Sequence, residues 1–178
     1  MSQQISYRLA QPEEAPTLLT LLREHGPNPW NYLPEEGIRT ELDWVAQGQA
    51  QAQVACHGEQ VVGMAILLPT TYRPDFFQYY PPQSRWRYIG DVVVHTDFAG
   101  HGIGSTLLQR CITQVVSEGA QQLWIDRHEE NLASAAMMRK AGFQLVGSYA
   151  DPARRSQGSR RTSVLMIELP LPKAAEAG

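Results

Sequence analysis

The amino-acid sequence predicts an α/β domain with a mixed, mainly antiparallel central sheet of about six to seven strands and with helices on both faces. Three observations lead to this fold class. Short β-like runs alternate with segments whose apolar residues recur at helical spacing, a tight turn joins one early pair of strands, and two strand candidates follow the last helix. With 178 residues, the chain has the length of one domain. We expect this domain to cover residues 1–170 and a flexible tail to follow at 171–178.

The first half of the chain predicts a strand, two helices and a hairpin. The expected elements are a strand at 5–9, a helix between Gln11 and the break at Gly26, a second helix from about Glu35, and strands at 50–57 and 61–68. Ala50, Ala52, Val54 and Cys56 alternate with Gln51, Gln53 and Ala55, the period-2 pattern of a half-buried strand. Gly58 and Glu59 supply the turn of the hairpin.

The segment 69–87 is irregular and rich in proline and aromatic residues. Loops of this length are often functional, so we look there for substrate contacts. The alternative is that its aromatic side chains extend the core.

The second half alternates strand and helix twice and ends in two strands. The expected elements are a strand at 88–95, a helix after Gly104, a strand at 123–127, a helix at 131–141 closed by Gly142, and strands at 143–148 and 162–169. Between the last two strands, residues 151–161 carry four arginines, and we expect a solvated basic loop. Contact with the phosphates of a cofactor or with an acidic substrate is the alternative.

Composition excludes several classes of function. The formal net charge of −3 and a pI of about 5.9 do not fit a protein that binds a phosphate backbone, so we expect no nucleic-acid partner. No stretch of about 18 apolar residues predicts a membrane span. The first residues lack a secretory signal, so a cytoplasmic location is expected.

Cysteine and histidine spacing gives no sign of a disulfide framework or a metal site. Cys56 and Cys111 are too few for either a disulfide framework or a four-thiolate zinc site, and we expect both to be buried. The five histidines show no metal-binding spacing, so no metal is expected.

The segment 95–105, His-Thr-Asp-Phe-Ala-Gly-His-Gly-Ile-Gly-Ser, carries the clearest chemical signal. It places glycines at 100, 102 and 104 between a strand and an apolar helix. Glycine lets a ligand approach the backbone closely, and the first turn of a helix has N–H groups without partners inside the helix. The helix dipole adds positive potential at the same end, which suits a pyrophosphate. The alternative is a glycine-rich turn that only fits between strand and helix.

Two familiar nucleotide motifs do not match these letters. A P-loop needs Gly-Lys followed by Ser or Thr, and the chain contains no such triplet. The dinucleotide motif G-x-G-x-x-G would need a third glycine at Ser105 or at Leu107. ATP-binding and NAD-binding folds are therefore disfavoured.

Two segments resemble motifs of the GNAT N-acetyltransferase superfamily. Residues 91–104 are similar to its acyl-CoA-binding motif, a strand followed by a glycine-rich turn, and residues 131–143 are similar to a later motif in which Asn precedes a helix that ends in Gly-Phe. The order of elements between about residues 5 and 169 also agrees. The resemblance implies the GNAT fold, acetyl-CoA as the cofactor, and, less directly, a homodimer.

The resemblance also implies roles for individual residues. Backbone groups of Val92, Val93 and Val94 would pair with the pantetheine arm, and Asn131 would lie near it. The pyrophosphate would be held by the backbone amides of Gly100, His101, Gly102, Ile103, Gly104 and Ser105. Similar enzymes transfer acetyl directly to an amine in a ternary complex, so Cys111 need not be a nucleophile.

Two departures from the family pattern affect these expectations. The residue at the start of the glycine motif is Ala99, where the family has Arg or Gln, which removes a side-chain contact to the cofactor. Met138 stands where many relatives have a tyrosine that could protonate the leaving thiolate. A thiolate is a tolerable leaving group near neutral pH, and no general acid is assigned.

An alkylammonium acceptor must lose a proton before it attacks. At pH 7 this costs roughly 4.6 kcal/mol for a pKa near 10.4. Asp91, on the strand expected beside the thioester, is the first candidate for the base, and His95 is the second because alternation along a regular strand puts it on the same face. A structural role for Asp91 is the alternative. We expect Tyr88 and Arg127 to contact the substrate, although Arg127 has the alternative of an ion pair with Glu129 or Asp91.

The sequence therefore predicts an acetyl-CoA-dependent N-acetyltransferase that acts on a primary amine of a small molecule. One alternative is a protein or peptide acetyltransferase, which would need an open groove. The other is a non-catalytic acyl-CoA sensor, which is motivated by the departures at Ala99 and Met138.

Overall fold

The computed structural model describes residues 4–170, which form one seven-stranded sheet and four α-helices. The expected tail at 171–178 lies outside the described residues. The strands are β1 (Ile5–Leu9), β2 (Gln51–His57), β3 (Gln60–Leu67), β4 (Trp86–Val94), β5 (Gln122–His128), β6 (Gln144–Ala150) and β7 (Arg161–Glu168). The helices are α1 (Ala15–His25), α2 (Glu35–Ala46), α3 (Ile103–Ser117) and α4 (Leu132–Ala141). Short 3-10 turns occur at Pro12–Glu14, Asp75–Gln78 and Thr96–Phe98.

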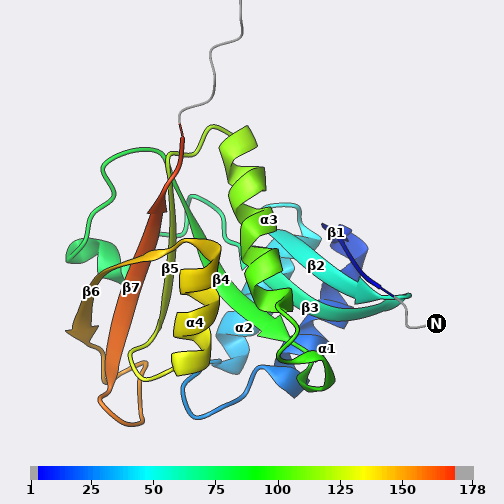
Figure 1. Cartoon of the computed structure of the whole chain (residues 1–178), viewed down its shortest axis with the longest axis horizontal. Coiled ribbons are helices and arrows are strands. Elements are labelled where there is room, and N and C mark those ends of the chain that lie inside the picture. The colour runs from blue at the N-terminus through cyan, green and yellow to red at the C-terminus, as the bar shows by residue number, and fades with distance from the viewer. Residues whose placement is uncertain (1–3, 171–178) are drawn as a thin grey trace, which may run out of the picture.

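The strand order is β1-β2-β3-β4-β5-β7-β6, and among residues 4–170 the pair of β4 with β5 is the one parallel pair. Helix α3 makes the crossover between these two strands (Figure 1). The prediction of a mixed, mainly antiparallel sheet is therefore confirmed.

Helices cover both faces of the sheet and give it two hydrophobic cores. Helices α1 and α2 bury Leu18, Leu22 and Leu42 on one face, in a cluster that also includes Tyr88 of β4. On the other face, α3 and α4 pack against the sheet through residues that include Leu107. Figure 1 shows α3 and α4 in front of the sheet with α1 and α2 behind it.

Strand β2 is buried on both faces, so the expectation of a half-buried strand was wrong. All residues from Ala52 to Cys56 are buried, including the polar Gln53. The small side chains on the face that was expected to be open lie under α3, where Gln53 donates a hydrogen bond to Gln114 at 2.8 Å. Alternation in the letters cannot reveal such cover, because a helix can pack on small and amide side chains.

Strands β4 and β5 pair over only three residues and then separate. The pairs run from Trp86 with Gln122 to Tyr88 with Trp124, and residues of β4 beyond Tyr88 have no partner on β5. On the β3 side, Leu67 pairs with Ile89 and Ala65 pairs with Val92. Between these two pairs, β4 advances by three residues while β3 advances by two. This is a β-bulge that contains Gly90 and Asp91, and bulges redirect side chains next to active sites.

The aromatic segment before β4 belongs mainly to the core. Phe76 and Phe77 are buried, and both rings pack against Trp124 of β5, with centroids 5.9 and 5.2 Å away. Tyr72 and Tyr79 are exceptions, because they are 40% and 56% exposed. Among residues 4–170, no helix has the length and apolar character required to cross a membrane.

Candidate active site

The glycine loop presents a row of backbone amides at the start of α3. Gly100 and Gly102 have φ angles of +81° and +76°, a left-handed conformation that favours glycine, and Gly102 is the N-cap of the helix. Thr106 is the first residue of α3 whose amide donates a helical hydrogen bond, which the carbonyl oxygen of Gly102 accepts at 3.1 Å. Within residues 4–170, no backbone carbonyl accepts a hydrogen bond from the amides of residues 100–105. These amides are free to bind an anion.

A cavity of about 550 Å³ lies over this row, and we call it the amide cavity. Its lining includes residues of the loop and of β4, namely Gly100, Gly102, Gly104, Ser105, Val92, Val93 and Val94, and residues of other segments, namely His25, Asn31, Asn131, Ser134, Met137 and Lys140. The sequence therefore predicted most of one wall. Residues on α1, α4 and the segment after α1 complete the cavity.

The three glycines serve different purposes. A Cβ atom on Gly102 would lie 3.4 Å from the Nζ atom of Lys140, so the Lys140 ammonium group stands beside the row of amides. A Cβ atom on Gly104 would instead overlap the sulfur atom of Met137 on α4. Gly104 therefore permits the close approach of α3 and α4, which the pattern of alternating glycines did not reveal.

A second, smaller cavity of about 70 Å³ lies where β4 and β5 separate, and we call it the strand-gap cavity. It shares Asn31, Val92, Asn131, Ser134 and Met137 with the amide cavity. Met138 lines it and is buried, so this position offers no titratable group to the cavity. Asn131 caps α4 by accepting a hydrogen bond from the amide of Ser134 at 3.1 Å.

A third cavity of about 230 Å³ lies on the α2 side, and we call it the aromatic recess. Its lining includes Tyr32, Glu41, Trp44, Leu68, Tyr72, Tyr88, Gly90, Asp91 and Arg154. It shares Tyr32, Gly90, Asp91 and Arg154 with the strand-gap cavity. The three cavities therefore follow β4 in sequence, from Val94 at one end to Tyr88 at the other.

Asp91 stands at the junction between the strand-gap cavity and the aromatic recess. Burial raises the pKa of its carboxyl group above the ordinary value. The carboxyl group of Glu41, from α2, faces it within hydrogen-bonding reach, and burial together with the charge of Asp91 raises the pKa of Glu41 well above its ordinary value. Two carboxyl groups so close together hold one proton between them.

A third carboxyl group, that of Asp126 on β5, has the opposite environment. Its Oδ2 atom receives hydrogen bonds from Arg154 at 3.0 Å and Arg155 at 3.3 Å, and its Oδ1 atom receives one from the Tyr88 hydroxyl at 2.6 Å. Burial by itself would raise the pKa of Asp126, but the two guanidinium groups outweigh it and lower the pKa. Asp126 is therefore ionised.

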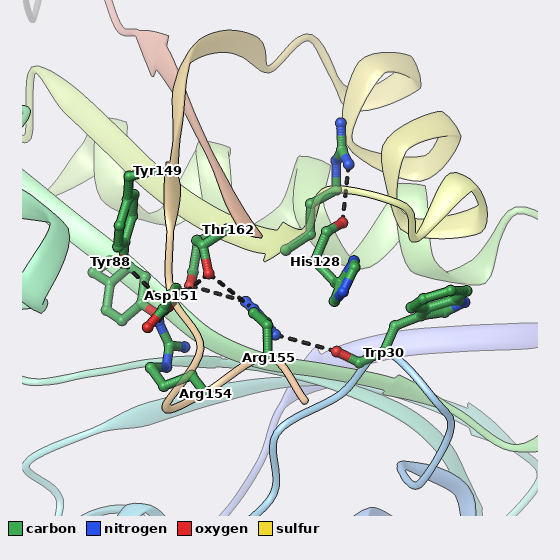
Figure 2. A network of polar contacts seen from close by, with 10 residues as sticks. Trp30, Tyr88, His128, Tyr149, Asp151, Arg154, Arg155 and Thr162 are labelled. Carbon is green, nitrogen blue, oxygen red and sulfur yellow. Dashed lines mark hydrogen bonds and ion pairs between the residues drawn. The ribbon is translucent and has the colours of Figure 1, made fainter. Parts of the chain in front are cut away.

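The two arginines also tie separate segments together. Arg155 donates to the hydroxyl of Thr162 on β7 at 2.9 Å and to the carbonyl oxygen of Trp30 at 3.2 Å. Figure 2 shows Arg155 reaching between these two partners, with Arg154 and Asp151 close by. The segment between α1 and α2, which lines all three cavities, is thereby held to the loop before β7.

The expectation of a solvated basic loop at 151–161 was therefore wrong for its central residues. Arg155 is 5% exposed, and the ion pairs of Arg154 and Arg155 with Asp126 keep both side chains over the site. The sequence showed the arginines but not their common partner, which lies 28 residues from Arg154 along the chain.

The family of the chain follows from a comparison with protein-family models. The model of the acetyltransferase (GNAT) family matches residues 16–143, which include the glycine loop and α4. The chain belongs to this family.

Solved GNAT structures share the fold at low sequence identity. A putative acetyltransferase from Salmonella typhimurium, solved with its cofactor acetyl-CoA, has a TM-score of 0.72 at 19% identity and covers 98% of this chain and 99% of its own. An IAA acetyltransferase from Bacillus cereus has a TM-score of 0.68 at 20% identity, covering 93% and 100%. The ribosomal-protein-S18-alanine N-acetyltransferase from Escherichia coli has a TM-score of 0.71 at 15% identity, covering 98% and 99%. No curated protein sequence is similar enough to be recognised as a relative.

Within this GNAT fold, the remaining candidate residues fall in different places. Tyr88 lines the aromatic recess, but its hydroxyl group is engaged by Asp126. Arg127 lines the strand-gap cavity and donates to the carbonyl oxygens of His128 and Glu129 at 3.0 and 2.7 Å. Among residues 4–170, it forms no ion pair with a carboxylate. His101 is exposed, as expected for a residue that offers only its amide.

His95 does not meet Asp91. It follows the end of β4, about 13 Å along the strand from Asp91 at the usual rise per residue, and its ring stacks on His25 at a centroid distance of 3.8 Å. Its Nδ1 atom accepts a hydrogen bond from the amide of Asp97 at 3.1 Å. A catalytic role for His95 stays a prediction, and the geometry favours Asp91.

Three charged residues of the site were not singled out from the sequence. Glu41 follows Ile38 by three residues and precedes Val45 by four, so it lies on the apolar stripe of α2, and a charge at such a position is a usable signal. Asp126 lies two residues after Trp124 and therefore on the same, buried face of β5. A carboxylate on a buried strand face is also a usable signal. Lys140 has no comparable signal, since basic residues are common in the last turn of a helix.

Cys111 is buried, and burial raises its pKa to about 12, which makes it unreactive.

Replacing Asp126 tests the network of ion pairs. In Asp126→Asn, two guanidinium groups lose their shared counter-charge, and we expect the free energy of unfolding at pH 7 to fall by about 3–5 kcal/mol in urea denaturation. Because the folded-state pKa of Asp126 is lowered, the difference from wild type should be full at neutral pH and should shrink as the pH falls below about 3.9. The control is Asp43→Asn, since Asp43 is exposed. Equal stability of the two variants would refute the role of the network.

Proposed function

We propose that this GNAT protein transfers acetyl from acetyl-CoA to a primary amine of a small molecule, by direct attack in a ternary complex with Asp91 as the base. The single observation that carries the proposal is the order of the cavities. The amide cavity, the strand-gap cavity and the aromatic recess follow one another along β4, and Asp91 lies where the last two meet.

The residues of the amide cavity fit a coenzyme A molecule. Amides of residues 100–105 and the ammonium group of Lys140 would hold the pyrophosphate, and together they compensate for the lack of a side-chain contact from Ala99. Backbone groups of Val92, Val93 and Val94 have no partner on β5 and would pair with the pantetheine arm. When bound, acetyl-CoA supplies an acetyl group activated as a thioester.

Asp91 is placed to take the proton of the acceptor. Its raised pKa makes it a stronger base than an exposed aspartate, which reduces part of the roughly 4.6 kcal/mol cost of deprotonating an ammonium group at pH 7. Because Glu41 shares a proton with it, the pair accommodates one additional proton without creating an isolated buried charge. A water molecule between Asp91 and the amine serves equally well in this scheme.

The size of the aromatic recess favours a small acceptor. At about 230 Å³ it lies below the range of roughly 300–1,000 Å³ that is typical of pockets for drug-sized ligands. A protein acceptor would have to insert one terminal residue into it. The E. coli relative that acts on a ribosomal protein shares the fold alone and does not make such an acceptor the better choice.

Gly102→Val tests whether the row of amides binds coenzyme A. We expect the dissociation constant for coenzyme A to rise about tenfold or more, because a branched side chain both disfavours the φ of +76° and occupies the mouth of the cavity. The matched control is Gly48→Val. Gly48 has nearly the same φ, +75°, with open space around it, and it lies in the turn between α2 and β2. Calorimetry that gives unchanged affinity for both variants would refute the location of the pyrophosphate.

Asp91→Asn tests the base. Activity should rise with pH through the pKa of Asp91, since the ionised form accepts the proton. Because this pKa is raised, the rise should occur at a higher pH than the ordinary aspartate pKa of about 3.9 would give. The groups that surround Asp91 are Glu41, Asp126, Arg154 and Arg155. In the variant, we expect kcat to fall by about 100-fold or more and the limb to disappear, while affinity for coenzyme A is retained. An unaltered pH–rate profile would dismiss Asp91 as the base.

A panel of acceptors tests the function itself. Release of the coenzyme A thiol is measured with alkylamines, diamines, amino acids and a peptide with a free N-terminus. Turnover of small amines above the rate of hydrolysis supports the proposal, and turnover of the peptide alone would shift it to a protein acetyltransferase. Binding of coenzyme A without turnover on any amine would favour a non-catalytic sensor.

A further inference from the structure

The aromatic recess contains a carboxyl group without a cation. Within residues 4–170, the Asp91 carboxyl group, with which Glu41 shares a proton, is the one hydrogen-bonding partner of Glu41; no basic group lies within ion-pair distance, and the Oε2 atom of Glu41 is buried without a partner. Its one polar neighbour of note is the carboxyl group of Asp91. Buried carboxyl groups normally have a cation or a hydrogen-bond donor as partner. The Asp91–Glu41 pair therefore has room for a cation that the chain itself does not supply.

The backbone is shaped to admit Glu41 at this point. Gly90 lies in the bulge of β4, and a Cβ atom there would be 2.8 Å from the Oε1 atom of Glu41 and 2.8 Å from the Cδ1 atom of Leu68. Glycine at this position therefore leaves room for the Glu41 side chain in the wall of the recess. The side chain does not lie on the outer surface of α2, where charged residues are usually found.

The remaining walls of the recess suit a positive charge. Trp44 and Tyr72 contact each other edge to face with ring centroids 5.9 Å apart, and Tyr72 stacks against Tyr88 at 6.0 Å. Aromatic rings attract cations through their faces. Arg154 is the one cationic side chain in the described lining, and its charge is matched by Asp126 at 3.0 Å and Asp151 at 3.5 Å.

Glu41 and Asp91 occupy different positions relative to the reaction. Asp91 lines both the strand-gap cavity and the recess, whereas Glu41 lines the recess alone. An amine that reacts beside Asp91 therefore leaves Glu41 to the rest of the acceptor molecule. The short distance between the two carboxyl groups requires that the two nitrogen atoms of such an acceptor be separated by a short chain.

Resting on the proposed function, we propose that the acceptor is a compact diamine, whose reacting nitrogen lies at Asp91 and whose second, cationic nitrogen is bound by Glu41 beside Trp44 and Tyr72. Glu41 is then the residue that determines specificity.

The test uses four-carbon amines that differ in one terminal group. These are 1,4-diaminobutane with a cation, butylamine with a methyl group, 4-amino-1-butanol with a neutral donor and 4-aminobutanoate with an anion. We expect kcat/KM to be about tenfold or more higher for the diamine than for butylamine, and lowest for the anion, because a hydrogen bond between charged groups discriminates by at least that much. Equal values for the diamine and butylamine would overturn the proposal.

Glu41→Gln tests whether Glu41 causes the preference for the diamine. The amide keeps the shape of the side chain but cannot ionise to bind a cation, so the preference for the diamine should fall to within about threefold. Glu36→Gln, on the exposed side of α2, is the matched control and should keep the full preference. Thermal unfolding checks that both variants fold, and a preference that survives in folded Glu41→Gln would contradict the assignment.

Binding separates this inference from the proposed function. Calorimetry with 1,4-diaminobutane and with butylamine, on the protein alone and with coenzyme A, does not need turnover. If no amine is acetylated but the diamine binds more tightly than butylamine in a Glu41-dependent way, the function fails and the recess is correctly assigned. If monoamines are acetylated and the diamine neither binds nor reacts better, the function holds and the inference fails.

Discussion

The separation of β4 from β5 is the constraint on which the site depends. The two strands form the one parallel pair of the described sheet, and they pair from Trp86 to Tyr88 before the bulge at Gly90 and Asp91 turns β4 away. A continuous sheet would satisfy the backbone of Val92, Val93 and Val94 internally. Because it does not, a row of unpaired groups runs into the free amides of the glycine loop, and both must be satisfied by water or by a ligand.

The sheet stays open because other groups fill the remaining space. On one face, Met137 and Met138 of α4 lie against the gap, and α4 approaches α3 at Gly104. On the other face, Asp126 binds two arginines from the loop before β7. These contacts join the two halves of the sheet through side chains where backbone pairing has ended, so the gap is a fixed part of the fold.

The same gap gives three carboxyl groups two different environments. Asp126 is buried with guanidinium groups and stays ionised, whereas Asp91 and Glu41 are buried facing each other and have raised pKa values. The bulge decides this arrangement, since it turns Asp91 toward the face on which α2 presents Glu41. The Asp126 network therefore supplies rigidity. The Asp91–Glu41 pair supplies a proton acceptor and carries a negative charge that has no cation within ion-pair distance among the described residues.

The sequence by itself determined the order of the elements, the mixed sheet, the family and the row of amides at residues 100–105, because periodicity, turns and glycine spacing are local properties. It also indicated Asp91, since that residue lies next to a recognisable motif. Only the tertiary structure decided what faces Asp91, which partner the arginines of the loop 151–161 have, that Gly104 serves helix packing, and that β2 is covered on both faces. Each of these depends on segments that are distant in the chain. Burial and charge pairing are set by the neighbours that folding brings together, and no local pattern of letters contains them.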